Sequence, residues 1–303
     1  MNSARAAGSN RRRLLRRFEP LLWLGPVLIL LLVVVIYPIF EMISAAFSEM
    51  SRSGIPQGFA GFDNFISLFA LPDLGHIILQ TLLWLVAVVG LTLVISWPIA
   101  LLLNQHFPGR VWVRYAVIVP WAAALVMTSL IFKWIYNYYY GALNAVLMGL
   151  GILKEPVDWL GSPALAWVSL IVVGVFVSVP FNTYVLLAGL QSVPHEMYEA
   201  ARLDGAGHFS IWLHITRPML RSSVMVAVAL NIIGVFNSFP VIWLLTGGGP
   251  NRMTHTTITY MYELAFRSRS LGEAAALSVV NFAALIVIIV IYLRFQRKNN
   301  EVL

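Results

Sequence analysis

Amide side chains lie inside several long uncharged runs of this sequence, and they are the groups there best suited to bind a polar solute. Asn182 lies in one run, Asn231 and Asn237 lie in another, and Asn281 lies in a third. An amide both donates and accepts hydrogen bonds, which suits a hydroxyl-rich solute, and the ring of Phe236 can stack on a sugar face. We predict that these five residues line a substrate pathway. Hydrogen bonding between helices is the other use of such amides.

The same runs contain no acidic residue and no histidine. Proton-coupled carriers keep such groups inside the membrane, so proton coupling is disfavoured, whereas sodium coupling through broken helices stays open. The six histidines form no HExxH pair, and the chain has no cysteine. We therefore expect neither an intramembrane enzyme nor a metal site.

A phosphate-binding loop needs a lysine followed by serine or threonine. The three lysines of this chain, Lys133, Lys154 and Lys298, are followed by tryptophan, glutamate and asparagine. We expect no catalytic residues and no cofactor in this chain. A process driven by ATP would need an ATPase on another chain, and a self-powered secondary carrier or a channel is the alternative.

These side chains must be positioned by membrane-spanning helices. The chain is 59% hydrophobic and 11% charged, against about 25% charged residues in soluble domains. Uncharged runs near 21–40, 77–103, 115–132, 164–190, 222–245 and 274–293 are each long enough for a helix to cross about 30 Å of hydrocarbon. We predict an all-α polytopic membrane protein with six transmembrane helices.

Basic residues set the expected orientation. Most of the 20 lysines and arginines fall in the amino-terminal tail, in the loops near 104–114 and 191–221, and in the carboxyl-terminal tail. The positive-inside rule places these segments and both termini in the cytoplasm, where the basic residues face membrane lipid, and we expect no nucleic-acid binding. The predicted order is a cytoplasmic tail (1–20), a first transmembrane helix (21–40), an external loop (41–76), a five-helix core (77–295) and a cytoplasmic tail (296–303).

The cytoplasmic loop 191–221 carries the clearest local signals. Pro194 suits the first turn of a helix, Glu196 places negative charge near its amino end, and Gly205 and Gly207 end it, which predicts a helix over about 194–204. Such a short helix is marginal in water, so it depends on packing against a partner. An ordinary interfacial loop is the alternative.

This loop also resembles the EAA signature of binding-protein-dependent ABC importer permeases. The matching residues are Glu199, Ala200, Ala201, Gly205 and the later Ile215 and Pro218, although Arg217 replaces the usual leucine before the proline. The segments GFDNF (61–65), GALNAVL (141–147), AGLQSVP (188–194), LTGGGP (245–250) and LGEAAALS (271–278) extend the resemblance over most of the chain. They point to the carbohydrate-uptake branch and to its first permease, of the maltose and glycerol-phosphate type.

The resemblance implies a type I ABC importer permease fold in a bacterial or archaeal cytoplasmic membrane. It implies a coupling helix that contacts the ATPase through Glu199, Ala200, Ala201 and Gly205, with Asp204 as an addition. The implied partners are a second permease, two ATPase subunits that bind ATP and Mg, and an extracytoplasmic solute-binding protein. The implied solute is an oligosaccharide, monosaccharide, polyol or glycerol phosphate ester.

The binding protein is expected to contact the external loop from Thr246 to His255. Its turn-forming residues Gly247, Gly248, Gly249 and Pro250 are the predicted contact residues.

Overall fold

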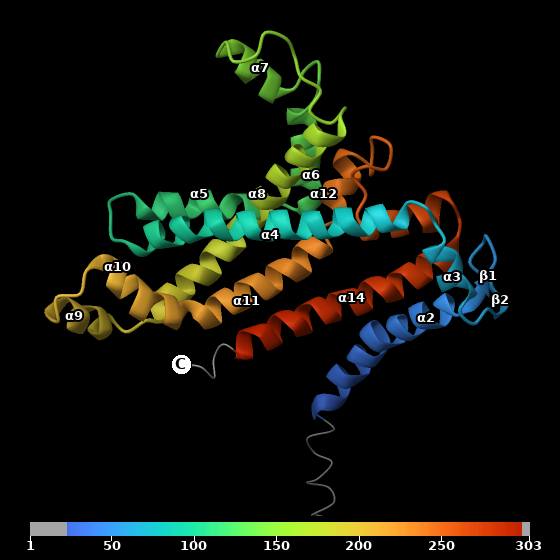
Figure 1. Cartoon of the computed structure of the whole chain (residues 1–303), viewed down its shortest axis with the longest axis horizontal. Helices are drawn as coiled ribbons and strands as arrows, with labels where there is room; N and C mark the ends of the chain where they lie inside the picture. The colour runs from blue at the N-terminus through green and yellow to red at the C-terminus, as the bar shows by residue number, and fades with distance from the viewer. Residues whose placement is uncertain (1–22, 299–303) are drawn as a thin grey trace, which may run out of the picture.

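The computed structural model describes residues 23–298, and the side chains of residues 23–294 within them. The predicted amino-terminal tail and the last five residues therefore lie outside the described part of the chain. The regular secondary structure of the described part is helical apart from one short antiparallel hairpin (Figure 1). The predicted all-α class is confirmed.

The elements follow one another as long helices joined by short ones. In order they are η1 (Leu32–Ile36), α2 (Tyr37–Ala46), β1 (Ser48–Met50), β2 (Pro56–Phe59), α3 (Asp63–Phe69), α4 (Leu74–Asn104), α5 (Arg110–Ala122), α6 (Leu125–Ile135), α7 (Ala142–Gly149), α8 (Pro163–Ser192), α9 (His195–Leu203), α10 (His208–Ile211), η2 (Trp212–Thr216), α11 (Arg217–Phe236), α12 (Phe239–Leu245), α13 (Thr257–Tyr262), η3 (Glu263–Arg267) and α14 (Leu271–Lys298). The η elements are single π-helical stretches that continue the helices beside them.

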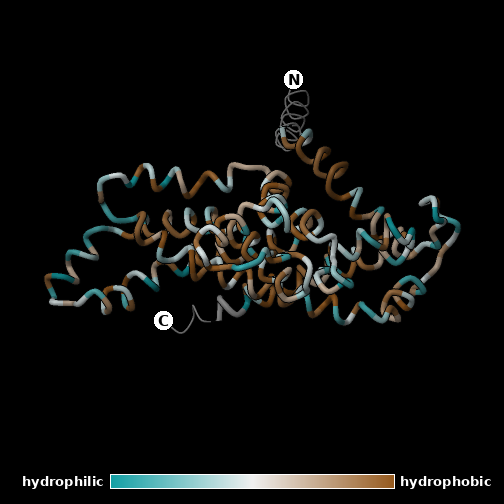
Figure 2. Tube along the Cα trace, turned by 90° about the horizontal axis from the view of Figure 1, so that it is seen from above, coloured by the Kyte–Doolittle hydropathy of each residue, from teal (hydrophilic) through white to brown (hydrophobic). Residues whose placement is uncertain are grey.

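Five helical stretches are long and apolar enough to cross a membrane: Trp23–Ala46, Leu74–Asn104, Pro163–Ser192, His208–Leu245 and Leu271–Arg294. The total reaches the predicted six only if the bent pair α5 and α6, which corresponds to the third predicted span, counts as one span. Along the chain, apolar residues fill the middle of the molecule and hydrophilic residues gather toward its two ends (Figure 2). This distribution fits a body that sits in a hydrocarbon layer.

The third predicted span, 115–132, is wrong as a single straight helix. Helix α5 ends at Ala122, the next two residues are extended, and α6 leaves at 96° to α5. Pro120 lies in the last turn of α5, where it lacks an amide hydrogen and crowds the carbonyl one turn earlier. The uniform hydropathy of this run does not reveal the break.

The fifth span also differs from its predicted extent, 222–245. Its helix begins much earlier, at His208, and it is interrupted at Asn237 and Ser238 before α12 restarts. Pro240 is at the start of α12, where a missing amide hydrogen costs least. The interruption leaves backbone groups of α11 available to side chains from other helices.

The first helix continues to Ala46 rather than ending near residue 40. The segment predicted as an external loop, 41–76, therefore contains the end of this helix, the β1–β2 hairpin and α3. Asn64 in α3 donates hydrogen bonds from Nδ2 to the carbonyls of Ala46 and Ser48, at 3.0 and 2.9 Å, which joins these pieces.

The core lies where α4 packs along α8 and α11. Trp84 of α4 is 1% exposed and lies among Leu170 and Val173 of α8 and Val235 of α11. Gly174 allows this packing, because a Cβ atom at that position would approach the Trp84 ring to 2.6 Å. Helix α8 is thereby held directly against α4.

Candidate functional site

A cavity of about 210 Å³ lies where the two interrupted spans meet α8. Its walls come from α4, α5, α6, α8, α11 and α12, and none of its described lining residues is ionisable. The lining residues are Trp84, Trp121, Leu125, Gly174, Val177, Ser178, Phe181, Asn182, Leu230, Asn231, Gly234, Val235, Ser238 and Val241. We call this space the amide cavity.

Two amides of the cavity have polar atoms without a protein partner. Asn182 is 1% exposed and donates from Nδ2 to the carbonyl of Ser178 at 2.9 Å, which leaves its Oδ1 unpaired. Asn231 is 5% exposed, and its Nδ2 is unpaired. An unpaired buried polar atom costs about 1–3 kcal/mol, so such atoms usually bind water or a ligand. Together they offer one acceptor and one donor, the pair that a hydroxyl group can satisfy.

Aromatic rings complete the cavity. The rings of Trp121 and Phe181 are stacked, with centroids 6.5 Å apart and planes 27° apart. Trp84 donates from Nε1 to the carbonyl of Val235 at 3.0 Å and to Ser238 Oγ at 3.1 Å. The Trp84 indole therefore hydrogen-bonds to the end of α11 and to the break that precedes α12, and it forms one wall of the cavity.

None of these three aromatic residues was predicted as a site residue. A usable signal was present, because Trp121 and Phe181 each directly follow a proline within an apolar run. Proline marks the places where a membrane helix breaks and frees backbone groups.

The other predicted pathway residues lie elsewhere. Phe236 is buried in the main core, and Asn281 of α14 is buried outside the cavity lining. Asn237 is exposed and donates from Nδ2 to the carbonyl of Ile233 at 2.9 Å. Because a helix turns about 100° per residue, Asn231 and Asn237 point in directions about 120° apart. The structure thus brings two of the five residues into one cavity.

The predicted coupling helix is α9, close to its predicted bounds. None of its nine residues is buried. The Glu199 side chain is 62% exposed, and its Oε1 lies 3.1 Å from Nδ1 of His195. Ala200 and Asp204 are exposed, Ala201 is half-buried, and Gly205 has φ of 77°, a conformation that favours glycine.

An apolar side chain on α9 also faces outward, since Leu203 is 89% exposed. One link ties α9 to the span that follows it, because Tyr198 Oη lies 3.3 Å from Thr216 Oγ1 of η2. The helix therefore presents an open surface, and the contact between Tyr198 and Thr216 connects it to the body behind it.

The loop from Thr246 to His255 is held tightly to the rest of the molecule. The carbonyl of Met253 accepts hydrogen bonds from Gln80 Nε2 at 2.7 Å and from Trp167 Nε1 at 2.8 Å. Gly248 is buried against the His255 ring, and Gly247, Gly249 and Pro250 are half-buried. The exposed residues of this loop are Asn251 and Arg252. The predicted glycines therefore expose less surface to a binding protein than these two residues do.

An ion-pair network fixes the same loop. Arg252 contacts Asp73 at 2.7 Å and Glu263 at 2.9 Å, and His255 Nε2 lies 2.8 Å from Glu263 Oε2. The hydrogen bond with Asp73 raises the pKa of Arg252, whereas burial lowers the pKa of His255. Among residues 23–298, no three His, Cys, Asp or Glu side chains lie together in a group that could hold a metal ion.

The family described as "Binding-protein-dependent transport system inner membrane component" matches residues 3–300 of this sequence. The chain belongs to this family. The permease is 40% identical over 285 residues to a probable ABC transporter permease protein of Brucella suis, covering 94% of this chain and 99% of that protein. It is 34% identical to the sulfoquinovosyl glycerol transport system permease protein of Agrobacterium fabrum, covering 94% and 92% of the two chains.

Its fold matches a solved bacterial alginate ABC transporter in complex with an alginate pentasaccharide-bound periplasmic protein. The TM-score is 0.78 at 23% identity, over 94% of this permease and 96% of that chain. The predicted family and the importer permease fold are confirmed. The chain is thus a multi-pass inner-membrane transport subunit, and the roles of single residues stay predictions.

Proposed function

We propose that this permease forms part of the translocation pathway for a sugar or sugar-like solute, and that the amide cavity is the place where the solute is recognised. The unpaired atoms of Asn182 and Asn231 beside aromatic rings carry the proposal. The amide atoms can hydrogen-bond to sugar hydroxyl groups, and the aromatic rings can stack on the apolar face of a sugar. Relatives named for a sulfoquinovosyl glycerol and for alginate support a glycoside. The uncharged lining favours a solute without a phosphate at this position.

We also propose that import is driven by ATP bound with Mg on two separate ATPase subunits. The exposed surface of α9, with Glu199, Ala200 and Leu203, would contact one of them. The excess of basic residues beside α9 favours a cytoplasmic position for this helix and for both termini. A second permease and an extracytoplasmic solute-binding protein complete the proposed assembly.

Replacing both cavity amides tests the solute site. The double variant Asn182→Ala, Asn231→Ala removes two hydrogen bonds to solute, each worth about 1 kcal/mol, so we expect solute affinity to fall roughly tenfold or more. The measurement is ATP-dependent uptake of a panel of glycosides by the assembled transporter in proteoliposomes. Asn237→Ala is the matched control, because its exposed amide lies outside the cavity. Equal uptake and equal solute preference in the double variant and the control would reject the site.

A charge change on α9 tests the coupling surface. We expect Glu199→Ala to weaken co-purification of the ATPase subunits or solute-stimulated ATP hydrolysis by about tenfold, because a charged hydrogen bond across the interface is lost. Glu196→Ala is the control, since it removes the same charge from an exposed position of the same helix. Matching losses in the two variants would contradict a specific role for Glu199. A solitary permease that moves solute without ATP would favour the self-powered carrier instead.

A further inference from the structure

Three aromatic rings run in contact from the segment after α9 to helix α4. Phe209 of α10 is 74% exposed and stacks on Trp212 of η2, with centroids 6.0 Å apart and planes 26° apart. Trp212 in turn meets Trp97 of α4 edge to face, with centroids 6.5 Å apart at 83°. We call Phe209, Trp212 and Trp97 the aromatic row. It joins two segments that lie far apart in the sequence.

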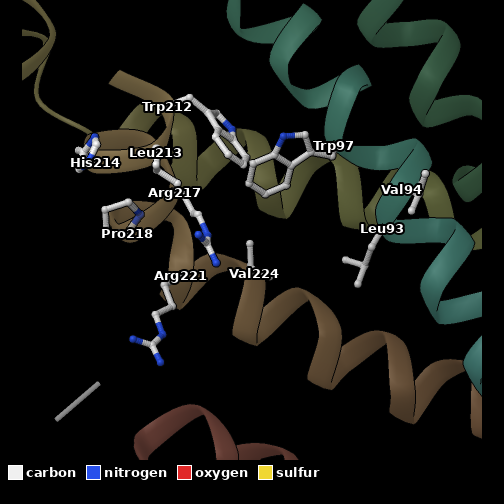
Figure 3. Close-up of a pocket in the computed structure, with 10 residues that line it drawn as sticks. All are labelled: Leu93, Val94, Trp97, Trp212, Leu213, His214, Arg217, Pro218, Arg221 and Val224. Atoms are coloured by element: carbon white, nitrogen blue, oxygen red, sulfur yellow. The ribbon is translucent and has the colours of Figure 1, made fainter. Parts of the chain in front are cut away.

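The row lies beside a groove of about 950 Å³ between α4 and the η2–α11 segment. In Figure 3, Leu93 of α4 stands apart from Val224 of α11, and Trp212 extends toward Trp97. The two indoles therefore bridge a space that separates the two segments. Close-packed interiors leave little room for movement, whereas this hollow leaves η2 and the start of α11 room to move relative to α4.

Trp97 is well supported on the side of α4. Its ring packs against a cluster that includes Ala100 and Leu103 of α4 and Leu186 and Leu190 of α8, each at most 4% exposed. A ring supported by a buried cluster resists displacement, because moving it would open a void in that cluster. Trp97 is therefore a firm contact point for the more mobile side of the groove.

The other side of the bridge leads to α9. Thr216 lies in η2 with Trp212, and its Oγ1 is 3.3 Å from Tyr198 Oη of α9. The same short π-helical stretch thus contacts both α9 and α4, and such stretches often mark functional sites. Along α4, Trp84 lies about 20 Å from Trp97, where its Nε1 donates to the carbonyl of Val235 beside the amide cavity.

We propose that Trp97 is a positioning residue for ATP-driven import, which holds η2, and with it α9, against α4. A displacement of α9 by the ATPase then moves α4 as well as α11. This inference rests on the coupling role proposed above for α9. An edge-to-face aromatic pair shifts an equilibrium about two- to tenfold, so losing it lets α9 move without α4. ATP is then hydrolysed with less solute carried.

Distances between spin labels test whether Trp97 positions α9. The chain has no cysteine, so Leu102→Cys on α4 and Glu196→Cys on α9 place two labels at exposed positions. The measurement uses the assembled complex without ATP, with the other subunits freed of cysteine. We expect Trp97→Ala to broaden the distance distribution, because the population of the packed arrangement falls about two- to tenfold, and Trp97→Phe to keep it narrow. Trp112→Ala is the control, since it removes an exposed tryptophan of α5. Equal widths for the wild type and Trp97→Ala would reject the inference.

Solute uptake per ATP hydrolysed, in proteoliposomes, tests the consequence for transport. We expect this ratio to fall about two- to tenfold in Trp97→Ala and in Trp212→Ala, and to fall no further in the double variant, because both changes remove one shared contact. A purely structural loss would lower uptake and hydrolysis together and leave the ratio unchanged, which overturns the positioning role. Losses that add in the double variant would show that the two indoles act separately, and would overturn it as well.

The two measurements separate this inference from the proposed function. Uptake by the wild type without ATP would reject ATP-driven import, and with it the transport role of Trp97. The label distances need no ATP, so they decide on their own whether Trp97 holds α9 against α4. A normal uptake ratio in Trp97→Ala, with ATP-driven uptake by the wild type, would reject this inference alone.

Discussion

Trp84 shows how one side chain links packing to the site. It is almost fully buried between α8 and α11, and its single donor contacts both the last turn of α11 and the residue at the interruption. The carbonyl of Val235 also accepts hydrogen bonds from the backbone amide of Ser238 at 3.3 Å and from Ser238 Oγ at 2.7 Å, so Trp84 and Ser238 together hold the end of α11. A group needed for stability is therefore also a wall of the amide cavity.

Gly174→Ala tests this packing at the residue scale. The added methyl group would overlap the Trp84 ring, so we expect a loss of about 1–3 kcal/mol of stability and weaker uptake. Gly90→Ala is the matched control, because it makes the same change on α4 where no atom lies within 4 Å. Thermal unfolding of both variants in detergent provides the comparison. Equal unfolding temperatures would mean that Trp84 moves aside without cost.

Sequence reasoning identified the amides but not their directions. Asn182 and Asn231 were predictable as polar groups in apolar runs, and so was Asn237. Their grouping depends on the angle between helices and on the break after Phe236, which hydropathy does not encode. Trp121 and Phe181 were missed for the same reason, because an aromatic residue in an apolar run usually contacts lipid or core.

At the scale of elements, the external loop is stabilised by charges that sequence reasoning did not pair. Arg252 joins Asp73, which precedes α4, to Glu263 at the start of η3. His255 completes the cluster from inside, where it also lies 3.0 Å from Thr259 Oγ1. The loop thus depends on residues almost two hundred positions apart.

His255 gives this loop an expected pH dependence. Burial lowers its pKa below the ordinary value of 6.5, with the cations Arg252 and Arg267 acting in the same direction and Glu263 opposing them. The unfolded state then binds a proton more readily, so stability should fall as pH drops below about 6.5. We expect thermal unfolding at about pH 5.5 and about pH 7.5 to differ more for the wild type than for His255→Gln.

His106→Gln is the control for this measurement, because His106 is exposed and lies outside the loop. A pH dependence that His255→Gln leaves unchanged would assign the effect to other groups.

Helix boundaries were predictable where local chemistry marks them. Pro194, Glu196 and Gly205 predicted a helix that the structure has at His195–Leu203. The bend between α5 and α6 was not predicted, although Pro120 lies beside it, since proline is tolerated within many membrane helices. The long apolar runs thus predicted the spans, and the breaks within them required the structure.

At the scale of the whole molecule, apolar residues lie in the middle and hydrophilic residues lie toward the two ends (Figure 2). The apolar middle fits the bilayer and α9 is open at one end (Figure 1, Figure 2). The loop from Thr246 to His255 is held near the other end of α4, by Asp73 and Gln80. The amide cavity lies between these ends, where α8 meets both interrupted spans. Movement of α9 can therefore reach the cavity by two routes along the chain, through α8, which ends two residues before α9, and through α11 by way of η2.

The uncharged lining of the amide cavity has an electrical consequence. Moving one elementary charge through the full membrane potential costs or yields about 2.3 kcal/mol per 100 mV. None of the described residues around this cavity carries an ionisable side chain, so rearranging them shifts no side-chain charge through that field. Rearrangement of this lining around a neutral solute would therefore add no voltage dependence to transport.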